Sequence, residues 1–180
     1  MEILHNIDIS VFYFINQTCK NTVCDLILPW ITNLGRPEFI LGLAIVFLFF
    51  RKKEVRTLGI LLLAGLTISY YSVYWIKNLV ARPRPFMALK NVNLLINITG
   101  HSFPSGHATL SFLSATLLTG CFKRWYIFYT IALVVALSRS YLGVHYPSDI
   151  LTGAILGSLL GYILIRVARG ANLMKNRGQK

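Results

Sequence analysis

The sequence predicts an all-α integral membrane protein, a helical bundle of five transmembrane helices, with a sixth left open, and an N-terminal interfacial helix. Hydrophobic residues make up 55% of the 180-residue chain and charged residues only 13%, whereas a soluble domain carries about a quarter charged residues. Lys and Arg outnumber Asp and Glu by 18 to 6, and they cluster between apolar runs, as in cytoplasmic loops of membrane proteins. The charge excess therefore indicates membrane topology, and we expect no nucleic acid partner.

The first part of the chain is predicted to hold short apolar segments that do not all cross the membrane. Residues 7–18 mix aromatic side chains with polar ones such as Asp8, which is typical of a helix in the membrane interface. Residues 23–34 contain Pro29 and are shorter than the roughly 20 residues of a full span, so we expect them to dip into the membrane or lie flat. Residues 38–50 cross only if the helix continues into the basic residues that follow, with snorkelling side chains.

Four apolar runs follow, and with the preceding segment they give five crossings that alternate in direction. These runs are residues 57–76, 103–122, 125–142 and 150–165. The alternation places the basic clusters between the crossings and at the C-terminus on one side, which the positive-inside rule assigns to the cytoplasm. We therefore divide the chain into short interfacial or membrane helices, a transmembrane domain and a basic cytoplasmic tail, at residues 1–36, 37–168 and 169–180.

The cysteines and the N-terminus predict no further processing. Cys19, Cys24 and Cys121 have no paired spacing that matches a metal or redox motif, so we expect free thiols. A bridge between Cys19 and Cys24 is the alternative if both lie outside the cell. Residues 1–19 lack a basic start and a small-residue cleavage site, so we expect no removable signal peptide.

Positive charge also occurs on the opposite, outer side, where the positive-inside rule disfavours it. Four basic residues lie there near helix ends: Lys77, Arg82, Arg84 and Arg139. Asp149 is the only acidic residue after Glu54, so we expect these cations to bind an anion that is not a protein carboxylate. Contact with phospholipid headgroups is the alternative for each of them alone.

Two further blocks on this side carry histidines. Pro104-Ser105-Gly106-His107 opens a crossing, and the unpaired N–H groups and dipole of a helix start attract anions such as phosphate. His107, in the first turn, is placed to give a proton to an oxygen that leaves a phosphoryl group. The block is therefore predicted to combine an anion site with a general acid.

The last block lies between the final two crossings and contains Arg139, His145 and Asp149. The planar guanidinium of Arg139 suits phosphate oxygens. If Ser148 caps the last helix, Asp149 lies in its first turn and reaches back to one ring nitrogen of His145. That contact would fix the tautomer and leave the other ring nitrogen free to attack.

Together the three blocks resemble the signature of the type 2 phosphatidic acid phosphatase (PAP2) superfamily. Its pattern is a lysine, six residues and Arg-Pro; then Pro-Ser-Gly-His; then Ser-Arg, five residues, His, three residues and Asp. All three parts match this sequence without a gap. The resemblance covers residues 57–165 and implies a membrane phosphatase that uses no metal or other cofactor.

The resemblance also implies a role for each residue. His145 would be the nucleophile that becomes a phosphohistidine, Asp149 would hold it, and His107 would act as general acid and then as general base. The phosphoryl oxygens would be bound by Lys77, Arg84, Arg139, the Ser105 hydroxyl and the Gly106 N–H. Arg82 lies inside the spacer of the first block, and two roles are open for it: contact with lipid headgroups or with the second phosphate of a substrate.

Among superfamily members, the chain is most similar to small bacterial enzymes that convert undecaprenyl pyrophosphate to undecaprenyl phosphate. Phosphatidylglycerol phosphate, phosphatidic acid and lipid A are alternative substrates, because the motif residues bind phosphate without reading the lipid tail. We expect the protein in the bacterial cytoplasmic (inner) membrane, with its active site on the outer, periplasmic face. Membrane lipids would surround it, and no obligatory protein partner is expected.

Two other classes of protein compete with this interpretation. A non-catalytic anion-binding receptor or transporter component would need the cations but neither His107 nor His145. A vanadate-dependent haloperoxidase would share the superfamily's site, but five membrane crossings and the lack of a soluble helical shell count against it. Both histidines and Asp149 thus favour an enzyme over an anion-binding protein, and the predicted crossings favour a phosphatase over a haloperoxidase.

Overall fold

The computed structural model describes residues 2–174, and every regular element within them is a helix. The all-α prediction is therefore confirmed. In chain order the elements are α1 (Glu2–Tyr13), the π-helix η1 (Phe14–Thr18), α2 (Thr22–Ile31), the 3-10 helix η2 (Thr32–Gly35), α3 (Pro37–Leu48), α4 (Lys53–Val80), α5 (Pro85–Ala88), α6 (Gly106–Phe122), α7 (Trp125–Tyr141) and α8 (Pro147–Gly170).

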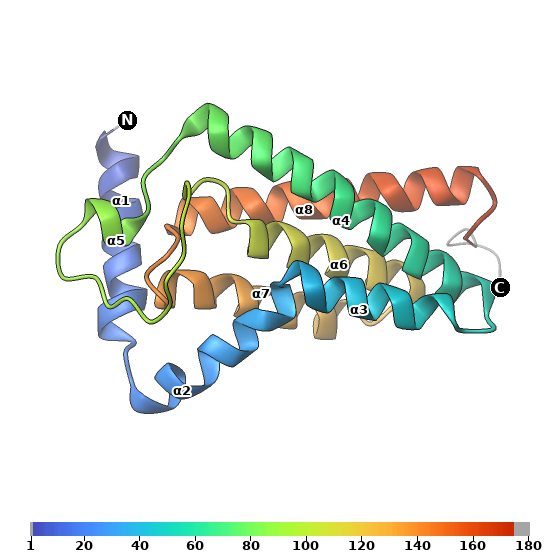
Figure 1. The fold of residues 1–180 in the computed structure, drawn as a ribbon, viewed down its shortest axis with the longest axis horizontal. Helices are drawn as coiled ribbons and strands as arrows, with labels where there is room; N and C mark the ends of the chain where they lie inside the picture. Colours follow the sequence, from blue (N-terminus) through green and yellow to red (C-terminus); the bar gives the residue numbers. More distant parts are fainter. Residues whose placement is uncertain (1, 175–180) are drawn as a thin grey trace.

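The longer helices form a bundle around α6. Helices α3, α4, α6, α7 and α8 run roughly along one axis, and α1 lies across one end of them (Figure 1). Helix α6 packs against α4, α7 and α8. The segment between α4 and α6 and the loop between α7 and α8 lie at the same end of the bundle as α1 (Figure 1). That end therefore collects the long irregular segments of the chain.

The described helices include two that are long and apolar enough to cross a membrane. These are Lys53–Ala88, which continues from α4 through α5, and Pro147–Gly170. The segments Thr22–Gly35 and Pro37–Leu48 pass the same test only as a pair, bent by 53° at their junction, so residues 23–34 lead into α3 through a bend. The chain is a multi-pass membrane protein with two or three spans by this measure, and five crossings remain a prediction.

Helices α6 and α7 account for the difference between these two or three spans and the five predicted crossings. Each has 17 residues and is therefore about 26 Å long at 1.5 Å per residue. That length is slightly less than the roughly 30 Å of a bilayer's hydrocarbon core. The two helices are thus near the limit of a crossing.

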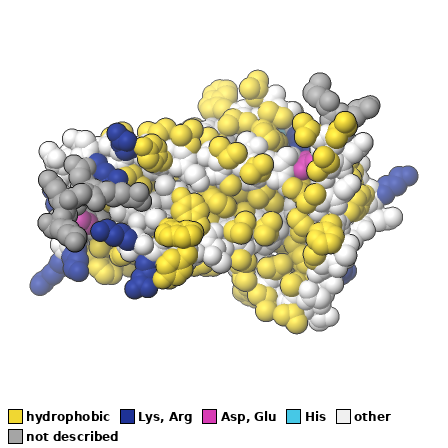
Figure 2. All heavy atoms as spheres, turned by 180° about the vertical axis from the view of Figure 1, so that it is seen from behind, with side chains coloured by type: hydrophobic (Ala, Val, Ile, Leu, Met, Phe, Trp, Pro, Cys, Tyr) yellow, Lys and Arg dark blue, Asp and Glu magenta, His cyan; other side chains and the backbone are white. Residues whose placement is uncertain are grey.

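The surface of the bundle is apolar between two polar ends. Ile60, Ile155 and Leu159 are each more than half exposed, and Figure 2 shows hydrophobic side chains spread over the middle of one face with Lys and Arg gathered mainly at one end. This end, on the left in Figure 2, carries the loops from α3 to α4 and from α6 to α7. The basic clusters at residues 51–56 and 123–124 thus lie together, whereas Lys175, Arg177 and Lys180 of the predicted basic tail lie outside the described residues.

Two glycines let α8 lie against the backbone of α6. A Cβ at Gly157 would lie 2.0 Å from the carbonyl oxygen of Thr109, and one at Gly153 would lie 2.6 Å from that of Ser105. Because the opposing atoms are backbone, no larger side chain fits without separating the helices. Such contacts through small residues are common between helices in membranes. This contact fixes the start of α8 beside the start of α6, where two of the three polar blocks lie.

The N-terminal helix is packed onto the bundle by both apolar and polar contacts. Phe12 is fully buried, and its ring centroid lies 5.8 Å from that of Tyr146. In η1, the amide of Asn16 donates to the carbonyl oxygens of Tyr141 (2.8 Å) and Asn93 (2.9 Å). The side-chain oxygen of Asn16 accepts from the backbone N–H of Asn93 at 2.9 Å. The predicted interfacial segment is thus helical and covers the end of the bundle that holds the polar blocks.

Candidate active site

The three polar blocks meet at the end of the bundle that α1 crosses (Figure 1). Backbone hydrogen bonds join them. The N–H of Ser102 donates to the carbonyl oxygen of Arg82 at 2.8 Å, and the N–H of Ser105 donates to that of Asp149 at 3.0 Å. The first bond links the end of α4 to the segment before α6, and the second links the starts of α6 and α8.

His145 lies in the loop between α7 and α8 and is 2% exposed. Gly143 begins the turn with φ of +83°, a conformation that favours glycine. The N–H of His145 donates to the carbonyl oxygen of Arg139 at 3.3 Å, and its own carbonyl oxygen accepts from the hydroxyl of Ser140 at 2.8 Å. The backbone on both sides of the ring is therefore held by the end of α7.

The carboxylate of Asp149 is fully buried and holds one side of the His145 ring. Its Oδ2 lies 3.5 Å from Nδ1 of His145 and accepts from the hydroxyl of Ser102 and from the N–H of Tyr146, the latter at 2.9 Å. Its Oδ1 accepts from Nη1 of Arg82 at 2.7 Å. A carboxylate in this place favours a proton on Nδ1, which leaves the lone pair on Nε2.

Ser148 does not cap the last helix, so the condition under which Asp149 was placed in the first turn is not met. Helix α8 begins at Pro147, and Tyr146 is its N-cap residue. The carboxylate of Asp149 binds the N–H of Tyr146, which would otherwise lack a partner at a helix start. Asp149 therefore lies in the first turn, as predicted, while Ser148 has contacts of another kind.

Burial keeps the ring of His145 neutral. Removal from solvent lowers the pKa of His145 to about 3, with the charges of Arg139 and Arg84 acting in the same direction and Asp149 opposing them. A histidine with this pKa is unprotonated at neutral pH, so its Nε2 has a free lone pair. The environment therefore suits a nucleophile.

Arg84 lies directly beside that nitrogen. Its Nη1 is 3.3 Å from Nε2 of His145 and donates to the carbonyl oxygen of Val144 at 3.0 Å. Its Nε and Nη2 donate to the carbonyl oxygens of Gly100 (2.9 Å) and Thr99 (3.1 Å). The guanidinium, 3% exposed, is thus oriented by neutral carbonyl oxygens, which leave its charge available to an anion.

Lys77 is held by the same segment. Its Nζ donates to the carbonyl oxygens of His101 and Ser102, at 2.5 Å and 3.2 Å. Because Ser102 also donates its hydroxyl to Asp149, the segment before α6 connects the lysine of the first block with the carboxylate of the third.

Arg139 supplies a cation with unused donors. It is 1% exposed, and its Nη1 donates to Oγ1 of Thr32 in η2 at 2.8 Å. Its Nε and Nη2 are buried without a hydrogen-bond partner. Unpaired buried N–H groups are costly and call for an explanation, and for a guanidinium the natural one is a bound anion.

The second block begins α6 as predicted. Ser105 is the N-cap residue, and its hydroxyl accepts from the N–H of Ala108 at 3.4 Å. Gly106 and His107 follow in the first turn, and with Lys77 they line a cavity of about 270 Å³ between α3, α4 and α6. The α4 wall of this cavity is apolar and aromatic, with Leu66, Tyr70, Val73 and Tyr74.

Arg82 differs from its prediction. It was expected to meet a lipid headgroup or a substrate phosphate, but its Nη2 and Nη1 pair with Asp8 (2.8 Å) and Asp149 (2.7 Å). The guanidinium carbon also lies 3.8 Å from the centroid of the Tyr146 ring. The expectation that all four outer cations need an anion other than protein carboxylate is therefore wrong for this one.

Two residues of the site were missed by the sequence patterns. Asp8 binds Arg82 from α1, and Ser102 binds Asp149 from the segment before α6. The only signal for Asp8 in the sequence is that an acidic residue lies in an apolar N-terminal segment. The spacing of the three blocks indicates neither Asp8 nor Ser102.

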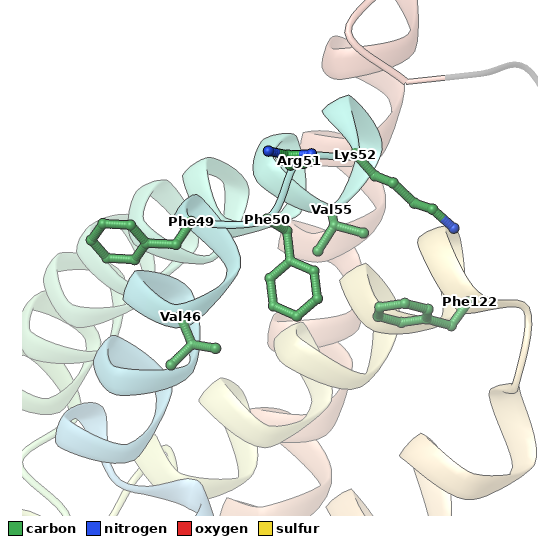
Figure 3. A pocket seen from close by; sticks show the side chains of 7 residues that line it. All are labelled: Val46, Phe49, Phe50, Arg51, Lys52, Val55 and Phe122. Atoms are coloured by element: carbon green, nitrogen blue, oxygen red, sulfur yellow. The ribbon is translucent and has the colours of Figure 1, made fainter.

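A second cavity, of about 750 Å³, lies at the opposite end of the bundle (Figure 3). It is lined by apolar side chains such as Phe49, Phe50 and Phe122, together with Arg51 and Lys52. It contains no histidine or carboxylate that could act as nucleophile, acid or base. The smaller cavity beside His107 is therefore the better candidate for chemistry.

Neither the cysteines nor a carboxylate cluster adds a metal site. Cys19, Cys24 and Cys121 are free. Residues 2–174 contain no group of three or more His, Cys, Asp or Glu side chains that could hold a metal ion. Metal-independent hydrolysis nevertheless stays a prediction.

Comparison with known proteins relates this site to a family. Residues 58–172 match the PAP2 superfamily. The chain is 31% identical over 150 residues to undecaprenyl-diphosphatase BcrC of Bacillus subtilis (strain 168), covering 81% of this chain and 76% of that protein. It is 29% identical over 141 residues to lipid A 4'-phosphatase of Porphyromonas gingivalis (strain ATCC 33277), covering 71% of this chain and 59% of that protein.

Two solved structures are also similar. The crystal structure of Aquifex aeolicus LpxE superposes with a TM-score of 0.79 at 29% identity, covering 88% of this chain and 94% of that chain. The transmembrane PAP2 type phosphatidylglycerolphosphate phosphatase from Bacillus subtilis has a TM-score of 0.78 at 24% identity, covering 99% and 90%, and shows the same fold. The fold, the order of the three blocks and these similarities lead to one conclusion: the chain belongs to the PAP2 superfamily of membrane lipid phosphatases.

Proposed function

We propose that the protein hydrolyses a phosphomonoester or pyrophosphate of a membrane lipid through a phosphohistidine on His145. One observation carries the proposal: the buried His145 ring lies between a carboxylate and a guanidinium. Nδ1 is 3.5 Å from Asp149, and Nε2 is 3.3 Å from Arg84. A neutral ring held in this way has its lone pair where arginine donors gather phosphoryl oxygens.

In the first step, Nε2 of His145 attacks the phosphorus and the bond from phosphorus to the leaving oxygen breaks. The ring becomes cationic as the P–N bond forms, and Asp149 stabilises this charge through Nδ1–H. His107, in the first turn of α6, gives a proton to the leaving oxygen. The lipid then departs with its oxygen protonated, while the phosphoryl group stays on His145.

In the second step, water attacks the phosphorus of the phosphohistidine. His107, which has lost its proton, now accepts one from this water. The P–N bond breaks, its electron pair returns to Nε2, and inorganic phosphate leaves. His145 is neutral again and His107 is protonated, so both are ready for another turnover.

The phosphoryl oxygens are bound by donors from all three blocks. The unpaired Nε and Nη2 of Arg139 would each donate to one of them, and Arg84 and Lys77 would add charge. The Gly106 N–H and the Ser105 hydroxyl contribute from the start of α6. Donors fixed before the reaction stabilise charge that develops in the transition state without having to reorganise.

The substrate is proposed to be a polyprenyl pyrophosphate, with undecaprenyl pyrophosphate converted to undecaprenyl phosphate. The cavity beside His107 has an apolar and aromatic α4 wall, which suits an extended hydrocarbon chain that enters from the bilayer. Undecaprenyl-diphosphatase BcrC is among the similar proteins. Phosphatidylglycerol phosphate, phosphatidic acid and lipid A are the alternatives, because lipid A 4'-phosphatase is a relative as well.

The orientation follows from the charges at the other end of the bundle. The exposed basic loops from α3 to α4 and from α6 to α7 would face the cytoplasm, and His145 would then lie on the outer face of the cytoplasmic membrane. A substrate there would present its headgroup to the periplasm. Reporter fusions after Lys123 test this, since a reporter that works only outside the cell must be inactive there.

The reaction and substrate are tested with purified protein in detergent. Phosphate release is compared for undecaprenyl pyrophosphate, phosphatidylglycerol phosphate, phosphatidic acid and lipid A, with His145→Ala as the control. We expect the highest kcat/KM for the pyrophosphate and no release by the variant. Release from another lipid at a higher kcat/KM would reassign the substrate, and no release from any lipid would favour an anion-binding protein without turnover.

A further inference from the structure

Asp8 belongs to a buried polar cluster that the proposed mechanism does not use. It comes from α1, 69 residues before Lys77 of the first motif block, and is 8% exposed. Its Oδ1 accepts from the N–H of Ser148 at 2.8 Å, and its Oδ2 accepts from the hydroxyl of Ser148 at 2.6 Å. The carboxylate thus binds the first turn of α8, one residue before Asp149.

Arg82 connects Asp8 with Asp149. Its Nη2 donates to Oδ2 of Asp8 at 2.8 Å, and its Nη1 donates to Oδ1 of Asp149 at 2.7 Å and to the hydroxyl of Ser148 at 2.7 Å. Its flat face lies over the Tyr146 ring. One guanidinium therefore bridges two buried carboxylates from helices at opposite ends of the sequence.

The two oxygens of Asp149 have different partners. Oδ2 faces Nδ1 of His145, and Oδ1 faces Arg82. An arginine paired with Asp149 alone would offset the negative charge that stabilises a cationic ring on His145, because a nearby cation disfavours that form. Asp8 supplies a second negative charge, so that the arginine orients Asp149 while its charge is shared between two carboxylates.

We propose that Asp8 is a positioning residue for phosphoryl transfer: through Arg82 and Ser148 it sets the orientation and the effective charge of Asp149, and thereby of His145. The inference rests on the proposed function, since it takes His145 as the nucleophile. It gives α1 a role in the reaction, although α1 carries none of the three motif blocks.

A purely structural role for Asp8 makes a different prediction. If Asp8 only anchors α1, its loss lowers the thermal stability of the protein but leaves the kcat of the folded protein unchanged. If Asp8 acts through Arg82, the two losses are not additive, because residues in one hydrogen-bond network are coupled. A double-mutant cycle on kcat therefore separates the two roles.

The experiment uses the full chain in detergent with a water-soluble isoprenyl pyrophosphate. In Asp8→Asn we expect kcat to fall about 10-fold, at the lower end of losses for outer partners of metal-bound histidines. KM should change little, since Asp8 does not line the cavity beside His107. Arg82→Gln should lose at least as much, and the double variant no more than Arg82→Gln alone. Trapped phosphohistidine should form more slowly in Asp8→Asn, in proportion to kcat.

Gln17→Ala is the matched control on the same N-terminal segment. The exposed Gln17 donates to the carbonyl oxygen of Asn91 at 2.7 Å, so its loss weakens the packing of this segment without touching Arg82, and kcat should stay at the wild-type value. An unchanged kcat in Asp8→Asn, an equal loss in Gln17→Ala, or losses that multiply in the double variant would each overturn the proposal.

Arg82→Lys provides a second route should Asp8→Asn not fold, as judged by thermal unfolding. Lysine keeps a positive charge between the two carboxylates, so this variant should retain most of the kcat that Arg82→Gln loses. Equal losses in Arg82→Lys and Arg82→Gln would contradict the charge-sharing role. If the wild-type protein neither releases phosphate nor traps it, the proposed function fails, and this outcome is distinct from a wild-type rate in Asp8→Asn.

Discussion

Both ends of the bundle carry positive charge, but the cations are exposed at one end and buried at the other. At the end with the α3–α4 and α6–α7 loops, Arg51, Lys52 and Lys123 are exposed. At the end with the motif blocks, Arg84 and Arg139 are 3% and 1% exposed and are oriented by hydrogen bonds to carbonyl and hydroxyl oxygens. In the proposed function, the exposed cations set the orientation in the membrane, a role that any Lys or Arg can fill, whereas the buried and oriented cations bind the phosphoryl group.

The strongest test of this contrast is removal of the proposed nucleophile. His145→Ala should abolish the phosphoenzyme and reduce turnover to near the uncatalysed rate, because no other described group takes the place of Nε2. Rapid quenching with a labelled substrate measures the trapped phosphate. Phosphate trapped in His145→Ala but not in His107→Ala would show that nucleophile and acid are assigned the wrong way round.

Removal of the proposed general acid should have a smaller effect that depends on the leaving group. His107→Ala should lose about 10² to 10⁴ in rate with a lipid monoester, whose alkoxide leaves poorly without a proton. An activated aryl phosphate needs less help, so the loss with that substrate should be smaller. Parallel assays with the two substrates measure the ratio, and equal losses with both would argue against proton donation by His107.

Arg139→Lys compares the ends directly. The change keeps the charge but removes the two unpaired guanidinium donors. We expect kcat/KM to fall about 10²-fold, which is typical when an enzyme loses one hydrogen-bond donor to the transition state. The matched control is Arg124→Lys at the opposite end, where the side chain is exposed and kcat/KM should not change. Similar rates in both variants would mean that the geometry of Arg139 has no part in catalysis.

The smallest expected effect is that of a chelator. If Lys77, Arg84 and Arg139 meet the charge of the phosphoryl group, then EDTA should leave the rate of phosphate release unchanged. Activity that disappears with EDTA and returns with Mg²⁺ would indicate that a bound metal ion, rather than these three side chains, offsets the charge of the phosphoryl group.

The parts of the site that the sequence predicted are those set by local spacing. His145 and Asp149 are four residues apart across the start of α8, with His145 just before the N-cap Tyr146 and Asp149 in the first turn, so their spacing in the sequence already keeps them close. Ser105 and His107 are placed in the same way by the start of α6. These relations hold in any fold that keeps the helix ends, which is why three short blocks indicated them.

The parts that the sequence did not predict depend on contacts between distant segments. Asp8 and Arg82 are 74 residues apart, and no periodicity relates them. The N-cap of α8 has the same origin. A serine before an acidic residue is a common cap, but here Tyr146 is the N-cap residue and the Ser148 hydroxyl donates to Asp8. The bend between η2 and α3 also depends on packing, since a Cβ on Gly35 would meet Ser111 and Val135 at 2.7 Å.

The glycines of α8 and the aromatic wall of α4 lie on different partners of α6, and this division has a consequence for how the protein can change. Gly153 and Gly157 tolerate no enlargement, because they hold the frame on which Ser105 and Asp149 are set. Tyr70 and Tyr74 are at least half exposed and line the cavity beside His107, so they can vary without disturbing that frame. Under the proposed function, substitutions on α4 alone would adapt the chain to other hydrocarbon tails and leave its phosphate chemistry unchanged.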